Sequence, residues 1–399
     1  MNDIGTIKHK NILFLQGPMG NFFKKVDDLF AKQGATTYKM GFNMGDSFFS
    51  NHTNYIPYRD KPENFSQFIK NFLIKQRIDK IFLFGDCRFY QRTAIKTAIE
   101  LNVDIFVFEE GYIRPNYITM ERYGVNDFSK ISRERAFYEK LDLEEVPEAQ
   151  NVHYSQFQMV SSAVLYYLVS NIFQKRYPHY IHHRDFSAMK EAFFGVRSFI
   201  RKLIYPLFEH QYKKIVATEL SKKYFFVPLQ THNDFQVLEH SEYKSVEKFI
   251  IEILESFAHA RTSAWLVFKH HPVDRGRKNY TKFIKEQAKL LNIEKRVLVL
   301  YDTHLPTLLK NAIGTVTINS TVGLSSLYHN TPTITLGNAI YDIEGLTCKG
   351  MRLDDFWHKQ DSPDTELLQK YKKFLIENTQ LNGSFYGKLP KEFQVLKPQ

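Results

Sequence analysis

The stretch KIFLFGD at residues 80–86 is the part of the sequence that best indicates the fold. Its first five residues form a continuous apolar run that stops at Gly85 and Asp86. A helical pattern at residues 93–101 follows, and then a second apolar run, DIFVF, at residues 104–108. Continuous apolar strands that alternate with helices are typical of a parallel sheet covered on both faces. We therefore predict a doubly wound α/β domain.

The same alternation extends in both directions along the chain. Toward the N-terminus, NILFLQ at residues 11–16 ends at a Gly-Pro-Met-Gly turn and precedes a helical pattern at 22–30. Beyond residue 223, apolar runs recur at 224–229, 265–269, 297–300, 315–318 and 333–336, with helical segments at 245–257, 280–291, 305–311 and 322–329. We predict a second doubly wound domain.

Two such domains, with ligands at the carboxyl ends of their strands, describe the GT-B architecture of glycosyltransferases, and also some epimerases and phosphorylases. The 399 residues exceed the roughly 250 to 300 that one hydrophobic core usually serves. The predicted parts are a Rossmann-like domain at 1–150, a helical basic and aromatic connecting segment at 151–223, a second Rossmann-like domain at 224–375 and a tail at 376–399.

The overall composition is that of an ordinary globular protein, with 43% hydrophobic and 24% charged residues. The two cysteines, Cys87 and Cys348, exclude a disulfide framework and a cysteine-based zinc site. The N-terminus has no signal-peptide pattern, and the apolar run at 159–173 is too short and too interrupted to span a membrane. These features predict a cytoplasmic protein.

The positive charge is concentrated in the connecting segment. The chain carries a net charge of +11, and residues 174–223 hold 11 Lys and Arg against four Asp and Glu. Nine aromatic residues lie among these charges at 177–212, a composition typical of a surface that binds an anionic membrane, with single-stranded RNA or plain solvent as the alternatives. The predicted membrane-contacting residues are Lys175, Arg176, Lys190, Arg197, Arg201 and Lys202.

An acidic motif follows the strand at 104–108. Glu109 and Glu110 are adjacent, so strand alternation sends their side chains to opposite faces. A carboxylate beside apolar walls can act as a general base or attack an anomeric carbon directly. The alternative is a structural acid that caps a helix or pairs with Arg114.

Two further motifs suit a phosphate. FKHHP at 268–272 ends a buried strand with a lysine and imidazoles that can neutralise a phosphate leaving group, unless the histidines simply pack in a loop. INSTVGLSS at 318–326 joins a strand to a helix start, where free N–H groups and hydroxyls favour a phosphate, although Ser320 or Thr321 can also be a plain N-cap. The common nucleotide-binding and zinc-protease motifs are missing from the sequence.

Together these blocks resemble the bacterial capsule polysaccharide biosynthesis and export family, and within it the short, single-module β-Kdo transferases of ATP-transporter-dependent (group 2) capsule assembly. The resemblance extends from about residue 11 to about residue 350. The blocks that carry it lie at residues 14–18, 42–46, 84–90, 109–115, 228–230, 269–272 and 319–323.

The resemblance implies a retaining GT-B enzyme that transfers Kdo from CMP-Kdo to lyso-phosphatidylglycerol at the cytoplasmic face of the inner membrane, with other capsule assembly proteins as possible partners. It maps the catalytic carboxylate onto Glu110, where longer relatives have Asp. It implies nucleotide contacts from Lys269, His271, Pro272, Ser320, Thr321 and Gly323. Further substrate-binding candidates are Gln16, Gly17, Asn43, Asp46, Asp86, Arg88, Arg114 and Gln230.

No metal or other cofactor is expected, because the donor has a single phosphate that Lys269, His271 and a helix N-terminus can neutralise. Three alternatives to this function stay open at the sequence level. They are a transferase for a related CMP-sugar of the sialyl type, a non-catalytic capsule assembly or export scaffold, and a basic RNA-binding protein.

Overall fold

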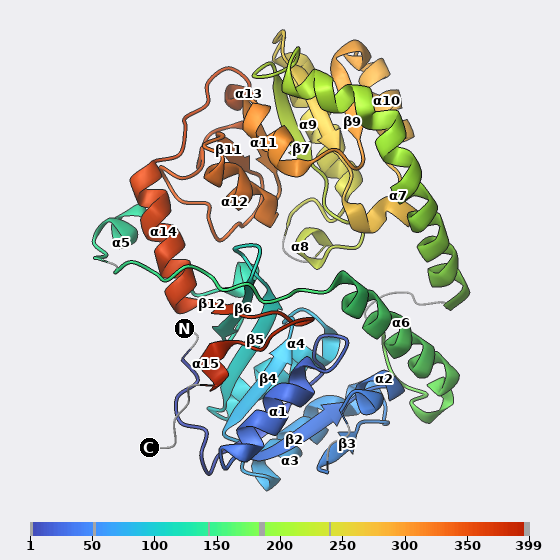
Figure 1. Ribbon diagram of the computed structural model, residues 1–399, viewed down its shortest axis with the longest axis vertical. Helices are drawn as coiled ribbons and strands as arrows, with labels where there is room; N and C mark the ends of the chain where they lie inside the picture. Colours follow the sequence, from blue (N-terminus) through green and yellow to red (C-terminus); the bar gives the residue numbers. More distant parts are fainter. Residues whose placement is uncertain (1–2, 51–52, 143, 183–187, 239–240, 395–399) are drawn as a thin grey trace. The chain divides into compact units, whose positions relative to one another are not determined.

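The computed structural model describes residues 3–50, 53–142, 144–182, 188–238 and 241–394. It divides into two compact units, each built around one sheet (Figure 1). Unit 1 comprises Met1–Lys130, Leu143–Ala188 and Lys373–Gln399, and unit 2 comprises Ile131–Asp142 and Met189–Lys372. The prediction of two doubly wound α/β domains is confirmed.

Unit 1 contains a seven-stranded sheet in the order β12-β6-β5-β4-β1-β2-β3. Its strands are β1 (Asn11–Phe14), β2 (Thr36–Gly41), β3 (Tyr55–Pro57), β4 (Lys80–Phe84), β5 (Asp104–Glu110), β6 (Tyr117–Arg122) and β12 (Gln380–Asn382). Its helices are α1 (Phe22–Lys32), α2 (Met44–Phe48), α3 (Phe65–Lys75), α4 (Phe89–Glu100), α6 (Gln156–Ile172) and α15 (Lys391–Gln394), with 3₁₀ turns at Pro62–Asn64, Asn126–Phe128 and Gln174–Arg176.

Both faces of this sheet are buried, as its continuous apolar strands predict. Strands β3, β2, β1, β4 and β5 are parallel, whereas β6 and β12 are antiparallel additions at one edge. Along β4, Ile81 and Leu83 pack in one core with Ile69 of α3 and Ala94 of α4. Phe82, between them, packs in the opposite core with residues of α1 and of the C-terminal segment.

Unit 2 contains a five-stranded parallel sheet in the order β11-β10-β7-β8-β9. Its strands are β7 (Tyr224–Pro228), β8 (Trp265–Lys269), β9 (Val297–Leu300), β10 (Gly314–Thr317) and β11 (Thr333–Thr335). Its helices are α5 (Arg135–Glu139), α7 (Ala188–Ala217), α8 (Phe235–Leu238), α9 (Val246–His259), α10 (Thr281–Leu290), α11 (Leu305–Asn311), α12 (Thr321–Tyr328), α13 (Leu353–Phe356) and α14 (Thr365–Asn378), with 3₁₀ turns at Pro272–Gly276 and Glu294–Arg296. α14 begins in unit 2 and ends in unit 1.

The units differ from the predicted boundaries at three places. The predicted connecting segment is helical, but α6 belongs to unit 1 and α7 to unit 2 from residue 189 onward. The C-terminal residues return to unit 1, because β12 pairs with β6 and Phe385 packs in its core. Residues 131–142 join unit 2, where Arg135 pairs with Asp364 at 2.9 Å. Residues 183–187 of the predicted segment and 395–399 of the predicted tail lie outside the described residues.

Candidate active site

In unit 1, β1 and β4 are neighbours, and the chain continues from them to opposite sides of the sheet. In open α/β sheets, ligands bind at such a switch point, outside the carboxyl ends of the two strands. Gln16, directly after β1, is buried. Its Nε2 donates to Asp46 Oδ2 at 3.1 Å, and its Oε1 accepts from Arg88 Nη1 at 3.2 Å. The fold therefore brings together three of the predicted substrate-binding residues.

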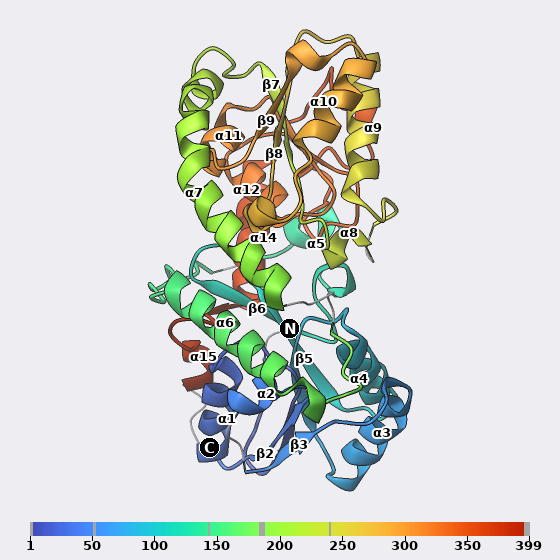
Figure 2. The same ribbon diagram turned by 90° about the vertical axis from the view of Figure 1, so that its right-hand side faces the viewer.

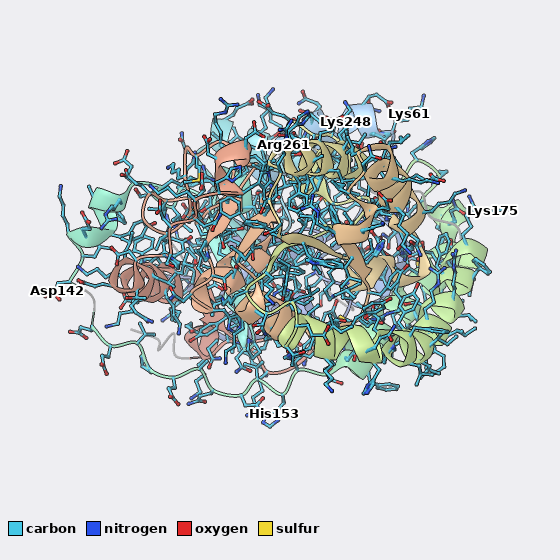
Figure 3. All side chains as sticks on the ribbon, turned by 90° about the horizontal axis from the view of Figure 1, so that it is seen from above. Lys61, Asp142, His153, Lys175, Lys248 and Arg261 are labelled. Atoms are coloured by element: carbon cyan, nitrogen blue, oxygen red, sulfur yellow. The ribbon has the colours of Figure 1, made fainter. Side chains whose placement is uncertain are left out.

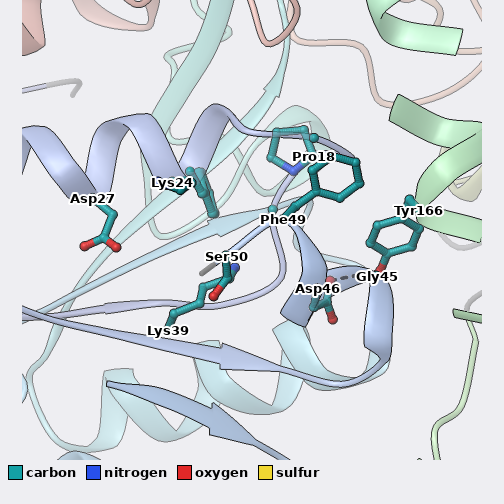
Figure 4. A pocket seen from close by; sticks show the side chains of 12 residues that line it. Pro18, Lys24, Asp27, Lys39, Gly45, Asp46, Phe49, Ser50 and Tyr166 are labelled. Carbon is teal, nitrogen blue, oxygen red and sulfur yellow. Dashed lines mark hydrogen bonds between the residues drawn. The ribbon is translucent and has the colours of Figure 1, made fainter. Parts of the chain in front are cut away.

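Asp46 is fixed by the start of α2 and by α6. Asn43 caps α2 by accepting from the Asp46 backbone N–H at 3.0 Å, and Asp46 Oδ2 accepts from the Phe42 N–H at 2.9 Å. The Tyr166 hydroxyl of α6 donates to Asp46 Oδ1 at 2.9 Å (Figure 4). With this many donors around it, Asp46 acts as an organising acceptor.

A pocket adjoins this network on the side of α1 and β2 (Figure 4). Lys39 lines it, and burial lowers the pKa of its amine to about 8, while nearby Asp46 and Asp27 oppose that shift. The Lys39 amine donates to the carbonyl of Leu15. Gly17 also lines the pocket, and a Cβ there would lie 2.6 Å from Phe23, so the glycine is required by the close approach.

The acidic motif lies at the end of β5, and its two carboxylates have different surroundings. Glu109 is half-buried on the side of Asp86 and Arg88, and burial raises its pKa to about 7. Glu110 reaches solvent, yet the surrounding protein removes enough water to raise its pKa, an effect that Arg114 opposes. Burial raises the pKa of Tyr154 and of Tyr386, and the charge of nearby Glu110 adds to both shifts.

A buried acid, Glu121, stabilises the loop that follows the acidic motif. Glu121 of β6 accepts from the Tyr112 hydroxyl at 2.7 Å and from the hydroxyl of Ser129. Burial raises the pKa of Glu121 to about 7. Asp86 is buried as well, and its Oδ2 accepts from the Val125 N–H at 2.8 Å. Asp86 therefore has a structural partner within unit 1.

The corresponding position in unit 2 lies between β7 and β10. Gln230, just after β7, donates from Nε2 to Asn319 Oδ1 at 3.1 Å, which ties together the loops that leave the two strands. Ser320 then caps α12 by accepting from the Val322 N–H at 3.2 Å. A Cβ at Gly323 would lie 2.1 Å from the Tyr341 hydroxyl, so this turn of α12 needs glycine.

The residues of the KHHP motif have three different environments. Lys269 is buried; burial lowers its pKa, while Asp302 and Glu209 oppose the shift. His270 stacks on Tyr301 with ring centroids 4.8 Å apart, and burial lowers its pKa to about 4. His271 is half-buried and accepts at Nδ1 from the Val273 N–H at 3.2 Å, directly before Pro272. His270 is a packed loop histidine, whereas His271 is more accessible.

The structure adds a pair that the sequence analysis missed. Asp274, which is 1% exposed, accepts from the His232 backbone N–H at 2.8 Å, and its other carboxylate oxygen lies 2.6 Å from His232 Nδ1. The pair joins the loop after β7 to the turn after β8. Because 42 residues separate the partners, no local sequence signal identifies the pair.

The six basic residues predicted to contact a membrane have different exposures. Lys175, Arg176, Lys190 and Lys202 are exposed, and Figure 3 shows Lys175 at the surface. Arg197 and Arg201 are half-buried, and Arg201 Nη1 donates to the Arg275 carbonyl at 2.7 Å.

Among the described residues, no helix is long and apolar enough to cross a bilayer. Nowhere among the residues that the structure describes do three His, Cys, Asp or Glu side chains gather as a metal site would require.

The chain is similar to known proteins over nearly its whole length. The family model for capsule polysaccharide biosynthesis proteins matches residues 79–386. The chain belongs to this family. It is 37% identical to the capsule polysaccharide export protein KpsS of Escherichia coli, over 94% of this chain and 97% of KpsS. It is 38% identical to the capsule polysaccharide modification protein LipB of Neisseria meningitidis serogroup B, over 95% of this chain and 92% of LipB.

A solved structure also aligns with the chain. It is the β-Kdo 2,7 transferase of KpsC from Thermosulfurimonas dismutans, at 12% identity and a TM-score of 0.45, covering 96% of each chain. The predicted resemblance to the capsule polysaccharide family is confirmed by the family model and the two relatives.

Proposed function

We propose that this family member is a retaining glycosyltransferase that moves one Kdo residue from CMP-Kdo to a lysophospholipid, lyso-phosphatidylglycerol, and so starts the lipid-linked end of a capsular polysaccharide. The observation that carries the proposal is the presence of two polar strand-end clusters, one in each doubly wound unit. The cluster in unit 1 is acidic at Glu109 and Glu110, and the cluster in unit 2 combines a helix start with His232 and His271.

The donor half of the reaction belongs to unit 2 in this proposal. The bond between the anomeric carbon of Kdo and the phosphate oxygen of CMP breaks, and CMP leaves with the electron pair. The accumulating charge suits the N–H groups at the start of α12, with donors from His271 and His232. Asp274 holds His232 by Nδ1, so Nε2 is the nitrogen that a phosphate reaches.

The acceptor half belongs to unit 1. An acceptor hydroxyl forms the new bond to the anomeric carbon and gives up its proton. Because the donor and the expected product are both β-linked, configuration is retained, either by double displacement through the Glu110 carboxylate or by front-face attack assisted by it.

The test is to incubate the purified chain with CMP-Kdo and lyso-phosphatidylglycerol and to measure CMP release and the mass of the lipid. We expect the lipid to gain one Kdo. Hydrolysis of CMP-Kdo with no lipid product would indicate a different acceptor. A lipid product formed only with a CMP-activated sialic acid would indicate a different donor. No CMP release under any condition would favour a non-catalytic capsule assembly protein. RNA binding in place of nucleotide-sugar binding would favour an RNA-binding protein.

A variant of the donor site sharpens this assay. His271→Ala removes a donor to the phosphate, which is worth roughly 1.5 to 3 kcal/mol when charge-assisted, so turnover should fall while the protein stays folded. A lower melting temperature with an unchanged rate would instead identify His271 as a loop-packing residue.

A further inference from the structure

The inward face of α6 carries buried hydrogen bonds, although helices usually pack on a protein mainly through an apolar face. Tyr166 is the buried residue of this helix, and its hydroxyl bonds to Asp46 and Gln16 of unit 1. One turn later, Ser170 Oγ accepts from the Gly45 N–H at 3.1 Å. Met159 of the same face packs against the core of unit 1, so α6 is attached to its unit by hydrogen bonds together with a few apolar contacts.

The outward face of α6 is apolar. Its exposed large side chains recur at intervals of three and four residues, so they line one side of the helix. We call this set the α6 stripe: Phe157, Val160, Val164, Leu165, Leu168 and Ile172. Phe157 is 84% exposed.

The inward face of α7 is attached to unit 2 through polar and aromatic contacts along most of its length, and Val216 near its end packs in the core. Glu191 pairs with Arg277 at 2.7 Å, and Tyr205 stacks on Tyr301 with centroids 4.2 Å apart. Glu209 is buried and accepts from the Asp302 N–H at 2.9 Å and the Thr303 hydroxyl at 3.0 Å. These partners lie on the loops that follow β8 and β9.

The outward face of α7 is apolar over most of its length. We call its exposed large side chains the α7 stripe: Phe193, Val196, Phe199, Ile200, Leu203, Ile204, Leu207 and Phe208. Leu207 and Phe208 are 76% and 71% exposed. Figure 2 shows α6 and α7 each on the outside of its own unit.

We propose that the α6 and α7 stripes insert into the interface of an anionic lipid bilayer, which deepens the proposed function and rests on it for the identity of the lipid substrate. Contiguous apolar surface of this kind is rare on soluble monomers unless it binds a partner. Helices that lie in a bilayer surface combine a Phe- and Leu-rich face with flanking Lys and Arg. Lys190, Arg197 and Lys202 flank the α7 stripe in that way.

The charge of this region selects lipid over a neutral apolar partner. Residues 174–223 carry a net charge of +7, which complements an anionic leaflet. The same helices do not cross the bilayer, because none of the described helices is long and apolar enough. The sequence assigned membrane contact to the basic residues, whereas here the stripes provide the contact and the cations add to it.

The experiment is a vesicle flotation assay on the full chain, with phosphatidylglycerol-containing vesicles and with neutral phosphatidylcholine vesicles. The stripe variant is Leu203→Ser/Leu207→Ser/Phe208→Ser. Its matched control, Ile74→Ser/Ile99→Ser/Leu290→Ser, removes apolar side chains that are 57%, 52% and 74% exposed on other helices. We expect the stripe variant to lose at least tenfold in vesicle affinity at both low and high salt, while the control binds like the unmodified chain.

A second variant separates insertion from charge attraction. Lys190→Glu/Arg197→Glu/Lys202→Glu should weaken binding to anionic vesicles at low salt and leave the weaker binding to neutral vesicles unchanged. Unchanged flotation of the stripe variant would overturn the proposal. So would a chain that ignores vesicles but forms a dimer that the stripe variant abolishes, because the stripe would then be a protein interface.

A spectroscopic measurement does not depend on removing apolar surface. Leu207→Trp keeps the site apolar, and its fluorescence should shift to shorter wavelength with vesicles and be quenched by brominated acyl chains. No quenching would contradict insertion. Transfer of Kdo to a short-chain acceptor without vesicles tests the proposed function separately, so that failure of the chemistry and failure of membrane insertion give different results.

Discussion

At the scale of single residues, Glu110 and Glu109 differ in what surrounds them. Glu110 lies with Arg114, Tyr154 and Tyr386, whereas Glu109 lies with Asp86 and Arg88. Glu110 reaches solvent at the end of its strand, where a substrate can meet it, whereas Glu109 is half-buried near Asp86. This contrast is the basis for choosing Glu110 over Glu109 as the catalytic carboxylate.

We expect Glu110→Gln to lower turnover by at least about 100-fold, because the amide has neither the charge nor the basicity of the carboxylate. CMP binding should survive, since the proposed nucleotide site lies in unit 2. Glu109→Gln is the matched control in steady-state assays of CMP release. A dead Glu109→Gln variant beside an active Glu110→Gln variant would reverse the assignment.

The His232–Asp274 pair makes a prediction about the donor phosphate. An Asn side chain can replace Nδ1 of histidine but cannot replace Nε2, and Gln does the opposite. His232→Asn should therefore keep the contact with Asp274 and the melting temperature, yet weaken CMP binding roughly 10-fold to 100-fold, with His232→Gln recovering part of that loss. Calorimetry with CMP and with cytidine is the measurement; cytidine affinity should not change. Wild-type CMP affinity in His232→Asn would show that the pair is only structural.

Glu121 makes folding stability depend on pH. Its pKa is raised from 4.5 to about 7 by burial, so between these values the folded chain holds a proton that the unfolded chain releases. The stability must then fall as pH rises through this window, by up to about 3 kcal/mol from this group. Urea unfolding at several pH values should show a smaller fall for Glu121→Gln. An identical pH profile in the two proteins would mean that Glu121 ionises normally.

At the scale of secondary-structure elements, α6 connects the surface of unit 1 to its strand-end cluster. Its buried hydroxyl at Tyr166 accepts from Asn43 Nδ2 at 2.6 Å and donates to Asp46. One face of the helix thus completes the hydrogen bonds of the predicted substrate-binding residues, while the α6 stripe lies on the other. Tyr166 links α6 directly to Asp46 and Gln16, and Ser170 adds a second link through Gly45.

Removing that hydroxyl should be costly. In Tyr166→Phe, Asp46 and Asn43 lose a buried partner, and an unsatisfied buried polar group costs about 1 to 3 kcal/mol. Urea unfolding of Tyr166→Phe, Asp46→Asn and the double variant gives the coupling energy between the two side chains. Additive effects within about 0.3 kcal/mol would contradict a direct interaction.

At the scale of the whole molecule, the proposed chemistry uses protein groups to neutralise one phosphate. We therefore predict that turnover is unchanged in EDTA and that added Mg²⁺ does not raise it. The assay is CMP release after chelation and gel filtration. Loss of activity in EDTA with recovery in Mg²⁺ would require a metal in the donor site.

The sequence alone determined much of the fold, because buried parallel strands have a local signature. The runs at 80–84 and 265–269 are strands with those bounds, and the helix predicted at 245–257 is Val246–His259. It also determined the family, since the motif blocks recur in a fixed order. The proximity of Gln16, Asp46 and Arg88 follows from the rule that parallel strands end at one edge.

Only the tertiary structure decided the rest, because it depends on contacts between distant residues. Return of the C-terminal segment to unit 1 needs the pairing of β12 with β6, and the His232–Asp274 pair needs two loops to meet. The periodicity of α6 and α7 shows that each has an apolar face, but it cannot show which face packs inward. Buried hydrogen bonds to Tyr166 and Glu209 fix which side of each helix faces its unit, and the exposed large apolar side chains of the two stripes remain at the surface.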